Sequence, residues 1–267
     1  MIKPSITIFG VGRVGGALKK SLSNAGYSIA STFVRNTIPE SKNALGDIIF
    51  LTVHDRDIKN LADELASSFP SFEDKYVIHC SGTLDSSVLK SLAEKGAKTA
   101  SFHPLKAITL DDDSLAGVWF DMEGDASALK ILTEIAEDLG AECFEINPEA
   151  KPLLHAAAVV AANYLVTLMK LATDIANAGD IDREIALKAL LPLTESSLKN
   201  IKEKGFKGSL TGPIARGDVE TIQRHLQNLT TNPELLKFYK VLGIETLHLV
   251  TKLDNNRIKE LNNLLKN

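Results

Sequence analysis

The residues best suited to proton transfer are two histidines in different segments of the chain. His103 lies in Ser-Phe-His-Pro-Leu after an apolar run, and His155 lies in a long apolar stretch, eight residues before Asn163. Imidazole changes charge near neutral pH, so either histidine could act as a general acid or base. We predict that His155 transfers a proton, that Asn163 orients a substrate oxygen, and that His103 is a second acid or base. The alternative is that each is a turn or core residue satisfied by neighbouring backbone.

A glycine-rich segment near the start of the chain predicts a dinucleotide site. It reads Gly10-Val11-Gly12-Arg13-Val14-Gly15, between an apolar run and a helical pattern. In that setting the first glycine permits a tight turn, the second admits a pyrophosphate, and the third allows close helix–strand packing. The helix N-terminus adds amide donors. Val53, at the end of a later predicted strand, is expected to flank the same ligand. A purely structural glycine turn is the alternative.

The end of the second predicted strand bears on the choice between NADP(H) and NAD(H). A carboxylate about 20 residues after the glycine motif would bind the ribose 2′-hydroxyl of NAD. The chain instead reads Phe33-Val34-Arg35-Asn36-Thr37, with no carboxylate before Glu40. Because a guanidinium can pair with a 2′-phosphate, we predict NADP(H), bound through Arg35 and Asn36, with NAD(H) less favoured. Arg35 as a solvated surface charge is the alternative.

Three further polar residues are candidates for substrate binding. Ser81 lies in His-Cys-Ser-Gly-Thr after a predicted strand, where it could bind a nicotinamide or a substrate, or else cap the next helix. Thr211 and Arg216 lie in Leu-Thr-Gly-Pro-Ile-Ala-Arg-Gly-Asp, and the arginine could hold a carboxylate. His103 is expected to contact the same substrate.

The elements that would position these residues follow from hydropathy periodicity. Short apolar runs alternate with amphipathic stretches up to about residue 148, a pattern typical of a parallel α/β sheet. After Pro148 the pattern is helical throughout. We therefore predict an α/β fold with two domains: a Rossmann-type, mostly parallel sheet over 1–148 and an all-helical domain over 149–267. Strands are predicted at 5–10, 27–34, 47–53, 75–80, 97–102, 117–122 and 141–146. Helices are predicted at 14–25, 57–69, 86–95, 127–139, 149–178, 182–203, 218–229 and 232–253, with a tail helix to about 265 and a glycine-rich loop over 205–217.

Composition limits the classes of partner. The 267 residues carry a net charge of −4, which argues against a broad nucleic-acid or anionic-membrane surface. The two cysteines lack metal-ligand spacing, so we expect no metal and a reducing, cytoplasmic location. The apolar stretch 153–171 is interrupted by His155, Asn163 and Lys170, so we expect a buried core helix and no membrane span.

The quoted motifs, together with His-Ala-Ala-Ala-Val-Val-Ala-Ala-Asn-Tyr over 155–164, resemble a little-characterised group of NADP oxidoreductases. These have an N-terminal Rossmann-like domain and a C-terminal helical domain of unknown function. More distantly, the chain is similar to pyrroline-5-carboxylate reductase, prephenate dehydrogenase and ketopantoate reductase, within the 6-phosphogluconate dehydrogenase superfamily. The resemblance implies a substrate cleft between the domains and a homodimer completed by the helical domain.

The resemblance also bears on single residues. His103 resembles the histidine of the His-Pro-Met segment in prephenate dehydrogenases, and Ser81 the serine that precedes it. Arg35-Asn36-Thr37 resembles an NADP-selective turn, and Gly212-Pro213 falls near the substrate loop of pyrroline-5-carboxylate reductases. The Lys–Asn pair of several relatives is replaced here by His155 and Asn163 at wider spacing, which argues against a prephenate or 6-phosphogluconate activity.

The function expected from these residues is hydride transfer between NADP(H) and a small polar, carboxylated substrate, in which the cofactor carries the hydride chemistry. The alternative is a non-catalytic, NADP(H)-responsive binding protein whose helical domain serves dimerisation or binds a partner.

Overall fold

The computed structural model describes residues 3–34 and 37–266. The chain forms two compact units, Met1–Ala162 and Asn163–Asn267, and each is considered by itself. The predicted boundary at residue 148 lies where strands give way to helices.

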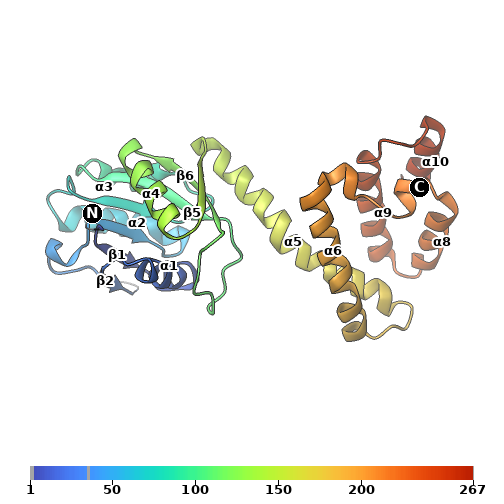
Figure 1. Cartoon of the computed structure of the whole chain (residues 1–267), viewed down its shortest axis with the longest axis horizontal. Coiled ribbons are helices and arrows are strands. Elements are labelled where there is room, and N and C mark those ends of the chain that lie inside the picture. Colours follow the sequence, from blue (N-terminus) through green and yellow to red (C-terminus); the bar gives the residue numbers. More distant parts are fainter. Residues whose placement is uncertain (1–2, 35–36, 267) are drawn as a thin grey trace. The chain divides into compact units, whose positions relative to one another are not determined.

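The first unit is built on one seven-stranded sheet in the order β2-β1-β3-β4-β5-β6-β7 (Figure 1). All neighbouring pairs are parallel except β5 and β6, which are antiparallel. The sequence prediction of a mostly parallel Rossmann-type sheet is confirmed, and each predicted strand has its counterpart. The strands are β1 (Ile6–Phe9), β2 (Ile29–Phe33), β3 (Ile48–Leu51), β4 (Tyr76–His79), β5 (Lys98–Pro104), β6 (Trp119–Gly124) and β7 (Glu142–Glu145).

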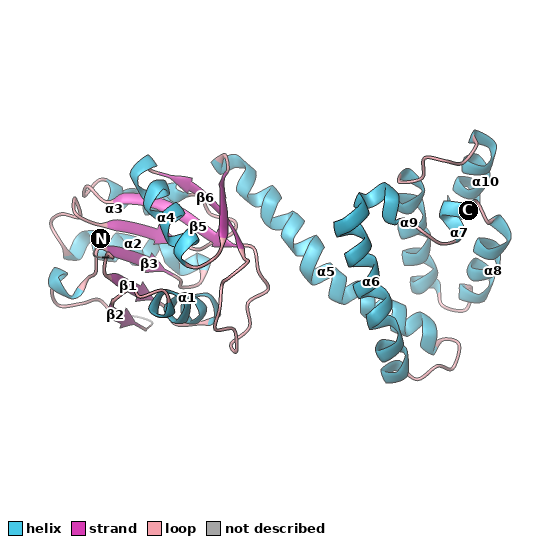
Figure 2. Ribbon diagram, viewed as in Figure 1, coloured by secondary structure: helices cyan, strands magenta, loops and turns pink. Residues whose placement is uncertain are grey.

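Helices cover both faces of this sheet (Figure 2). On one face α1 (Arg13–Asn24) and α4 (Ala126–Asp138) pack Leu18 and Leu132 against buried strand residues such as Ile8. On the other, α2 (Asp55–Ser68) and α3 (Lys90–Ala93), which follows the 3₁₀ turn η2 (Ser86–Leu89), pack against Ile49 and its neighbours. Successive strand residues point to opposite faces, so each strand contributes to both cores.

The short link between β2 and β3 sets where a ligand could bind. Among its described residues, the link contains one regular element, the 3₁₀ turn η1 (Lys42–Ala44). In the sheet β1 lies between β2 and β3, so the connection from β1 to β2 and the connection from β3 to β4 run toward opposite edges of the sheet. Open α/β sheets bind ligands at such a switch point, outside the carboxyl ends of the strands. Gly10 and Thr52 follow β1 and β3 at this position.

The second unit is helical, as predicted. The long helix α5 (Lys151–Asn177) begins in the first unit after η3 (Pro148–Ala150), and the others are α6 (Arg183–Ser209), α7 (Pro213–Arg216), α8 (Val219–Leu229), α9 (Pro233–His248) and α10 (Asn255–Lys266). Asp182 and Asp218 are the N-caps of α6 and α8: Asp182 accepts from the amides of Glu184 and Ile185, and Asp218 accepts from that of Thr221.

The prediction of a continuous loop over 205–217 is wrong. The helix α6 continues to Ser209 across a kink at Gly205, where φ is +68°, and α7 adds one further turn. Gly205 adopts this conformation at little cost because it has no Cβ, so a glycine here marks a kink within the helix.

The prediction that the long apolar stretch forms a buried core helix is also wrong for the single chain. The segment Pro148–Asn177 is long and apolar enough to cross a membrane, and its most apolar 18-residue window has no buried residue. The apolar composition of this helix predicted that its side chains pack against other elements, but no other element in the described part of this chain buries them.

The packing beneath the glycine turn provides a stability prediction. In Gly15→Ala, the new Cβ would lie 1.9 Å from the carbonyl oxygen of Gly10 and 2.4 Å from the Thr52 hydroxyl. We expect a loss of at least about 2 kcal/mol in the free energy of unfolding, measured by urea denaturation. The matched control is Gly16→Ala, next along α1, whose Cβ finds its nearest neighbour at 3.8 Å. It should leave stability unchanged or raise it by up to about 1 kcal/mol. Equal losses in both variants would contradict this packing.

Candidate functional site

The glycine turn between β1 and α1 is fixed by hydrogen bonds from Thr52, which follows the neighbouring strand β3. The Thr52 hydroxyl donates to the carbonyl oxygens of Phe9 at 3.0 Å and Gly10 at 2.5 Å. Gly10 has a φ of +90°, and a Cβ there would lie 2.9 Å from the Thr52 carbonyl oxygen. A Cβ on Gly12, in contrast, would find no atom within 4 Å. The turn is therefore tightly packed on its inner side and open on its outer side at Gly12.

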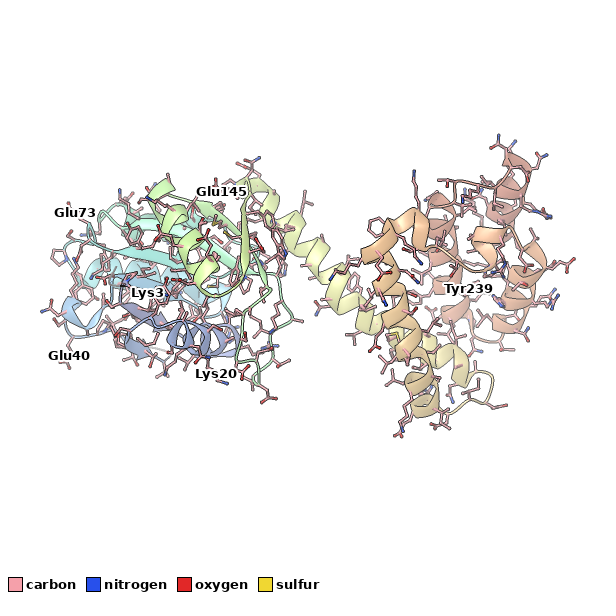
Figure 3. All side chains as sticks on the ribbon, viewed as in Figure 1. Lys3, Lys20, Glu40, Glu73, Glu145 and Tyr239 are labelled. Carbon is pink, nitrogen blue, oxygen red and sulfur yellow. The ribbon has the colours of Figure 1, made fainter. Side chains whose placement is uncertain are left out.

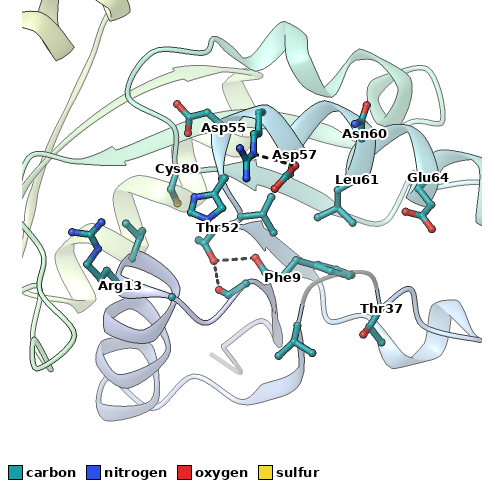
Figure 4. A pocket seen from close by; sticks show the side chains of 17 residues that line it. Phe9, Arg13, Thr37, Thr52, Asp55, Asp57, Asn60, Leu61, Glu64 and Cys80 are labelled. Atoms are coloured by element: carbon teal, nitrogen blue, oxygen red, sulfur yellow. Dashed lines mark hydrogen bonds and ion pairs between the residues drawn. The ribbon is translucent and has the colours of Figure 1, made fainter.

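This open side faces a cleft with a volume of about 880 Å³ (Figure 4). Of the residues predicted to bind the cofactor, Gly10, Gly12, Arg13, Val14 and Val53 line the cleft. Val11 is solvent-exposed, and Gly15 is buried under the turn. The remaining lining residues are Phe9, Val34, Thr37, Thr52, His54, Asp55, Arg56, Asp57, Asn60, Leu61, Glu64 and Cys80.

The residues predicted to select NADP, Arg35 and Asn36, lie outside the described residues. Their sequence neighbours Val34 and Thr37 both line the cleft. The assignment of NADP through Arg35 therefore stays a prediction.

Ser81 ties the loop after β4 to the start of α2. Its hydroxyl donates to a carboxylate oxygen of Asp55 at 2.7 Å and accepts from the amides of Thr83 and Leu84 at 3.2 and 3.1 Å. These contacts are those of a residue that caps the segment after it, which is the alternative that the sequence left open for Ser81. Its neighbour Cys80 lines the cleft, and burial raises the pKa of this thiol to about 12, which makes it a poor nucleophile.

His103 is oriented by a buried carboxylate on the neighbouring strand. It lies in β5, directly opposite Asp121 of β6 in the antiparallel register, and its Nδ1 is 2.7 Å from an Asp121 oxygen. Burial opposes ionisation of Asp121, but hydrogen bonds from His103 and Lys151 outweigh it and hold the pKa of Asp121 below its usual value. An ionised carboxylate can only accept, so Nδ1 of His103 donates the hydrogen and Nε2 remains available for a ligand.

The other oxygen of Asp121 accepts from Lys151, a residue that the sequence reasoning missed. Its Nζ donates to Asp121 at 2.8 Å and to the Ser101 hydroxyl at 2.7 Å, and its side chain has no exposed surface. Two signals could have found this pair. An acid interrupts the apolar run Val-Trp-Phe-Asp-Met over 118–122, and Lys151 precedes His155 by one helical turn on the same face.

His155 lies beside His103, so the structure brings together two residues that the sequence placed in separate clusters. Their ring centroids are 5.9 Å apart. A Cβ on Gly82 would lie 2.5 Å from Nδ1 of His155 and 2.8 Å from Nε2 of His103, so both nitrogens converge on this glycine. Nδ1 of His155 is buried and has no hydrogen-bond partner among the described residues. Unpaired buried nitrogens are rare and suggest that a ligand completes the contact.

A third histidine nearby, His79, plays a different part. It is fully buried, and its Nδ1 accepts from the Ser81 amide at 3.2 Å. Burial, aided by the charge of Lys151, lowers the pKa of His79 to about 4. His79 is therefore neutral at physiological pH and does not contribute charge to the pair.

The remaining predicted residues belong to the second unit. Asn163 on α5 and Arg216 at the end of α7 are both solvent-exposed. Thr211 lines a separate apolar groove of about 270 Å³, together with Phe238 and Tyr239 of α9. Tyr239 is labelled in Figure 3. Their roles toward a substrate stay predictions.

Comparisons with known proteins agree with this architecture. Residues 118–246 match a family model described as Domain of unknown function (DUF2520). No curated protein matches the sequence. A solved structure described as a "putative NADP oxidoreductase" from Bacteroides fragilis has a TM-score of 0.74 at 18% identity, covering 92% of this chain and 98% of that one.

Two further solved structures extend the comparison. A Thermotoga maritima protein has a TM-score of 0.66 at 26% identity, covering 91% of this chain and 98% of that one. Pyrroline carboxylate reductase from Plasmodium falciparum, solved with NADP bound, has a TM-score of 0.60 at 14% identity, covering 99% of both chains. The resemblance stated from the motifs is confirmed at the level of fold: the chain has the Rossmann-like sheet and the C-terminal helices of NADP oxidoreductases.

Proposed function

We propose that this protein is an NADP(H)-dependent oxidoreductase that transfers hydride to or from a small polar, carboxylated substrate. The observation that carries the proposal is the continuity between two features of the first unit. A glycine turn opens onto a cleft lined by Cys80, and two residues further along the same loop, Gly82 contacts the paired histidines. A dinucleotide site thus adjoins groups suited to proton transfer.

The glycine turn fits a pyrophosphate. Gly12 begins α1 with no side-chain cap, so the amides of the first helical turn remain free to donate to phosphate oxygens. The open space beside Gly12 would admit the phosphates, and Arg13 adds a positive charge at the rim of the cleft. NADPH, when bound, supplies the hydride at its nicotinamide ring. We assign selection of the 2′-phosphate to Arg35 and Asn36, as the sequence predicts.

His103 is the better oriented of the two candidate acids. Asp121 fixes its Nδ1, which leaves Nε2 to give a proton to the oxygen or nitrogen that becomes negative as hydride arrives, or to accept one in the reverse reaction. Nδ1 of His155, which is unpaired and close to Gly82, would hydrogen-bond the same substrate atom. This reverses the order that the sequence suggested, in which His155 came first.

We assign the recognition of the remainder of the substrate to the second unit. Arg216 would pair with a carboxylate, Thr211 would donate a hydroxyl hydrogen bond, and Asn163 would orient the substrate oxygen. The support is their chemistry and their place in the motifs that the resemblance covers.

We further propose that a second copy of the chain covers α5 and α6. In the second unit the apolar core is formed by α7 to α10, through residues such as Ile222 and Leu261. By contrast, α6 has 27 residues, of which only Ala186 is buried. Its exposed large apolar side chains are Ile185, Leu187, Leu191, Leu193, Leu198, Ile201 and Phe206. An apolar surface of this kind marks an interface, and the charged and polar groups along α5 argue against lipid as its cover.

The cofactor assignment predicts which substitutions abolish binding without loss of fold. Gly12→Ala should weaken NADPH binding at least about tenfold, because the methyl group occupies the approach of the pyrophosphate, while the melting temperature stays that of the wild type.

Arg35→Ala should weaken NADPH binding but not NADH binding, because only NADPH carries the 2′-phosphate with which the guanidinium would pair. Fluorescence titration measures both, with Gly16→Ala as control. If the wild type binds neither nucleotide, the proposed function is wrong; if it binds NADPH but oxidises it with none of a panel of keto acids and imines, a binding protein is favoured.

The histidine pair predicts the opposite pattern for Gly82→Ala. The added methyl group would clash with both rings, and displacement of reacting groups by about 1 Å can cost roughly 100-fold in rate. We expect turnover to fall by that order while NADPH affinity is retained. His103→Gln should act in the same direction. Unchanged turnover in both variants, measured by NADPH absorbance, would contradict the assignment of this pair.

The dimer predicts a concentration-dependent mass. Light scattering after size exclusion should give twice the chain mass of 28.9 kDa. Replacing Leu191 and Leu193 of α6 by glutamate should yield the monomer and lower the melting temperature, because the charges would be buried at the interface. Leu110→Glu is the matched control, since Leu110 is an exposed apolar residue of the first unit. A wild type that is monomeric at micromolar concentration would overturn the proposal.

A further inference from the structure

The one lysine in the described chain with no exposed side-chain surface is the first residue of α5, an unusual place for a cation. A positive charge is disfavoured at a helix N-terminus, where the peptide dipoles already place positive charge. Burial adds a further desolvation cost. Lys151 nevertheless lies there, with Nζ bound to Ser101 of β5 and Asp121 of β6. Such a placement requires a reason beyond helix formation.

The reason lies in what Asp121 does on its other side. Its two oxygens are divided between two partners, one bound to Lys151 at 2.8 Å and one to Nδ1 of His103 at 2.7 Å. Asp121 is itself 1% exposed, so water contributes little to its charge. We propose that Lys151 is a positioning residue for the acid–base step: its buried ammonium holds Asp121 as the anion that locks His103 with Nδ1–H inward and Nε2 toward Gly82. The proposal rests on the proposed function.

The charge of Lys151 has a second effect that a neutral anchor would lack. With Lys151 present, the group of three carries no net charge when His103 is neutral and one positive charge when it is protonated. A buried cation beside the pair therefore adds an electrostatic cost to any positive charge on His103, which a neutral anchor would not add.

The other titratable groups near this cluster do not reproduce that effect. His79 of β4 is neutral at physiological pH, and Cys80 after it is an un-ionised thiol. Glu123 of β6 accepts from the amide and hydroxyl of Ser86. Asp55 of α2 accepts hydrogen bonds from the hydroxyls of Ser81 and Thr83. Asp85 caps η2. His155 of α5 faces Gly82. Lys151 is thus the cation in direct contact with the Asp121 carboxylate that also binds His103.

The test is the titration of His103 followed by NMR of the imidazole nitrogens, which requires neither cofactor nor turnover. His103→Gln identifies the His103 signal among the six histidines. In the wild type we expect the neutral ring to carry its hydrogen on Nδ1. In Lys151→Met the titration midpoint should rise by about one pH unit, because the opposing charge is gone, and Lys151→Arg should restore it.

A double variant separates charge from packing. Asp121→Asn should lower the His103 midpoint by about one pH unit, since the attracting anion is lost and the cation remains. Lys151→Met with Asp121→Asn removes both charges and avoids an unpaired buried ion, so it should fold better than either single variant and titrate between them. Lys75→Met is the matched control: Lys75 is a buried lysine beside Asp47 and Asp74 at the start of β4, and its loss should cost stability without moving the midpoint.

The outcomes distinguish this inference from the proposed function. A His103 midpoint that is the same in the wild type and all folded charge variants, or a ring with its hydrogen on Nε2, overturns the role of Lys151. If the wild type turns over, but the pH dependence of turnover in Lys151→Met does not shift along with the His103 midpoint measured by NMR, the inference is overturned and the oxidoreductase assignment is left intact. Absence of turnover with every NADPH-dependent substrate refutes the function, while the titration still decides the charge coupling.

Discussion

The ion pair between Asp121 and Lys151 joins strand β6 of the sheet to the first turn of α5, and the geometry of the histidine pair depends on it. Two charges that are almost completely removed from water gain from each other only when their hydrogen bonds are well made, and here both Asp121 oxygens and the Ser101 hydroxyl take part. If one partner were absent, the other would be left buried and unpaired. The pair therefore fixes where α5 begins, and with it the position of His155 beside His103.

The two halves of the site were not equally accessible to sequence reasoning, and the difference is physical. The glycine turn is local: Gly10, Gly12 and Gly15 act through contacts within six residues and with the adjacent strand end, so their spacing carries the prediction. All seven strands were predicted for the same local reason: the central ones, such as β1 and β3, are buried at every position and so read as short continuous apolar runs. The histidine pair depends on contacts between residues that are far apart in the sequence, from the 18 positions that separate His103 and Asp121 to the 73 that separate Gly82 and His155. Periodicity gave His103 and His155 as separate candidates and gave no sign that Gly82 separates them.

The direction of one strand explains why Lys151 and Asp121 were missed. A strand at 117–122 was predicted, but only its antiparallel pairing with β5 places Asp121 opposite His103. A single sequence does not fix strand direction in a mixed sheet, since both directions bury the same apolar residues. The error over α5 has a related origin. An apolar helix face indicates that the helix packs against something, but the hydropathy pattern is the same whether the packing partner is its own chain or another copy.

The two parts of the candidate site are held in different ways: the glycine turn by local packing and the histidine pair by charge. The backbone conformation of the glycine turn is fixed by the hydrogen bond from the Thr52 hydroxyl and by close contacts that leave no room for Cβ atoms at Gly10 and Gly15. The histidine pair, in contrast, is held by ionised groups whose balance depends on pH, so its chemistry can be tuned without moving the backbone. Substitutions at Lys151 or Asp121 would therefore alter proton transfer while leaving the dinucleotide turn as it is.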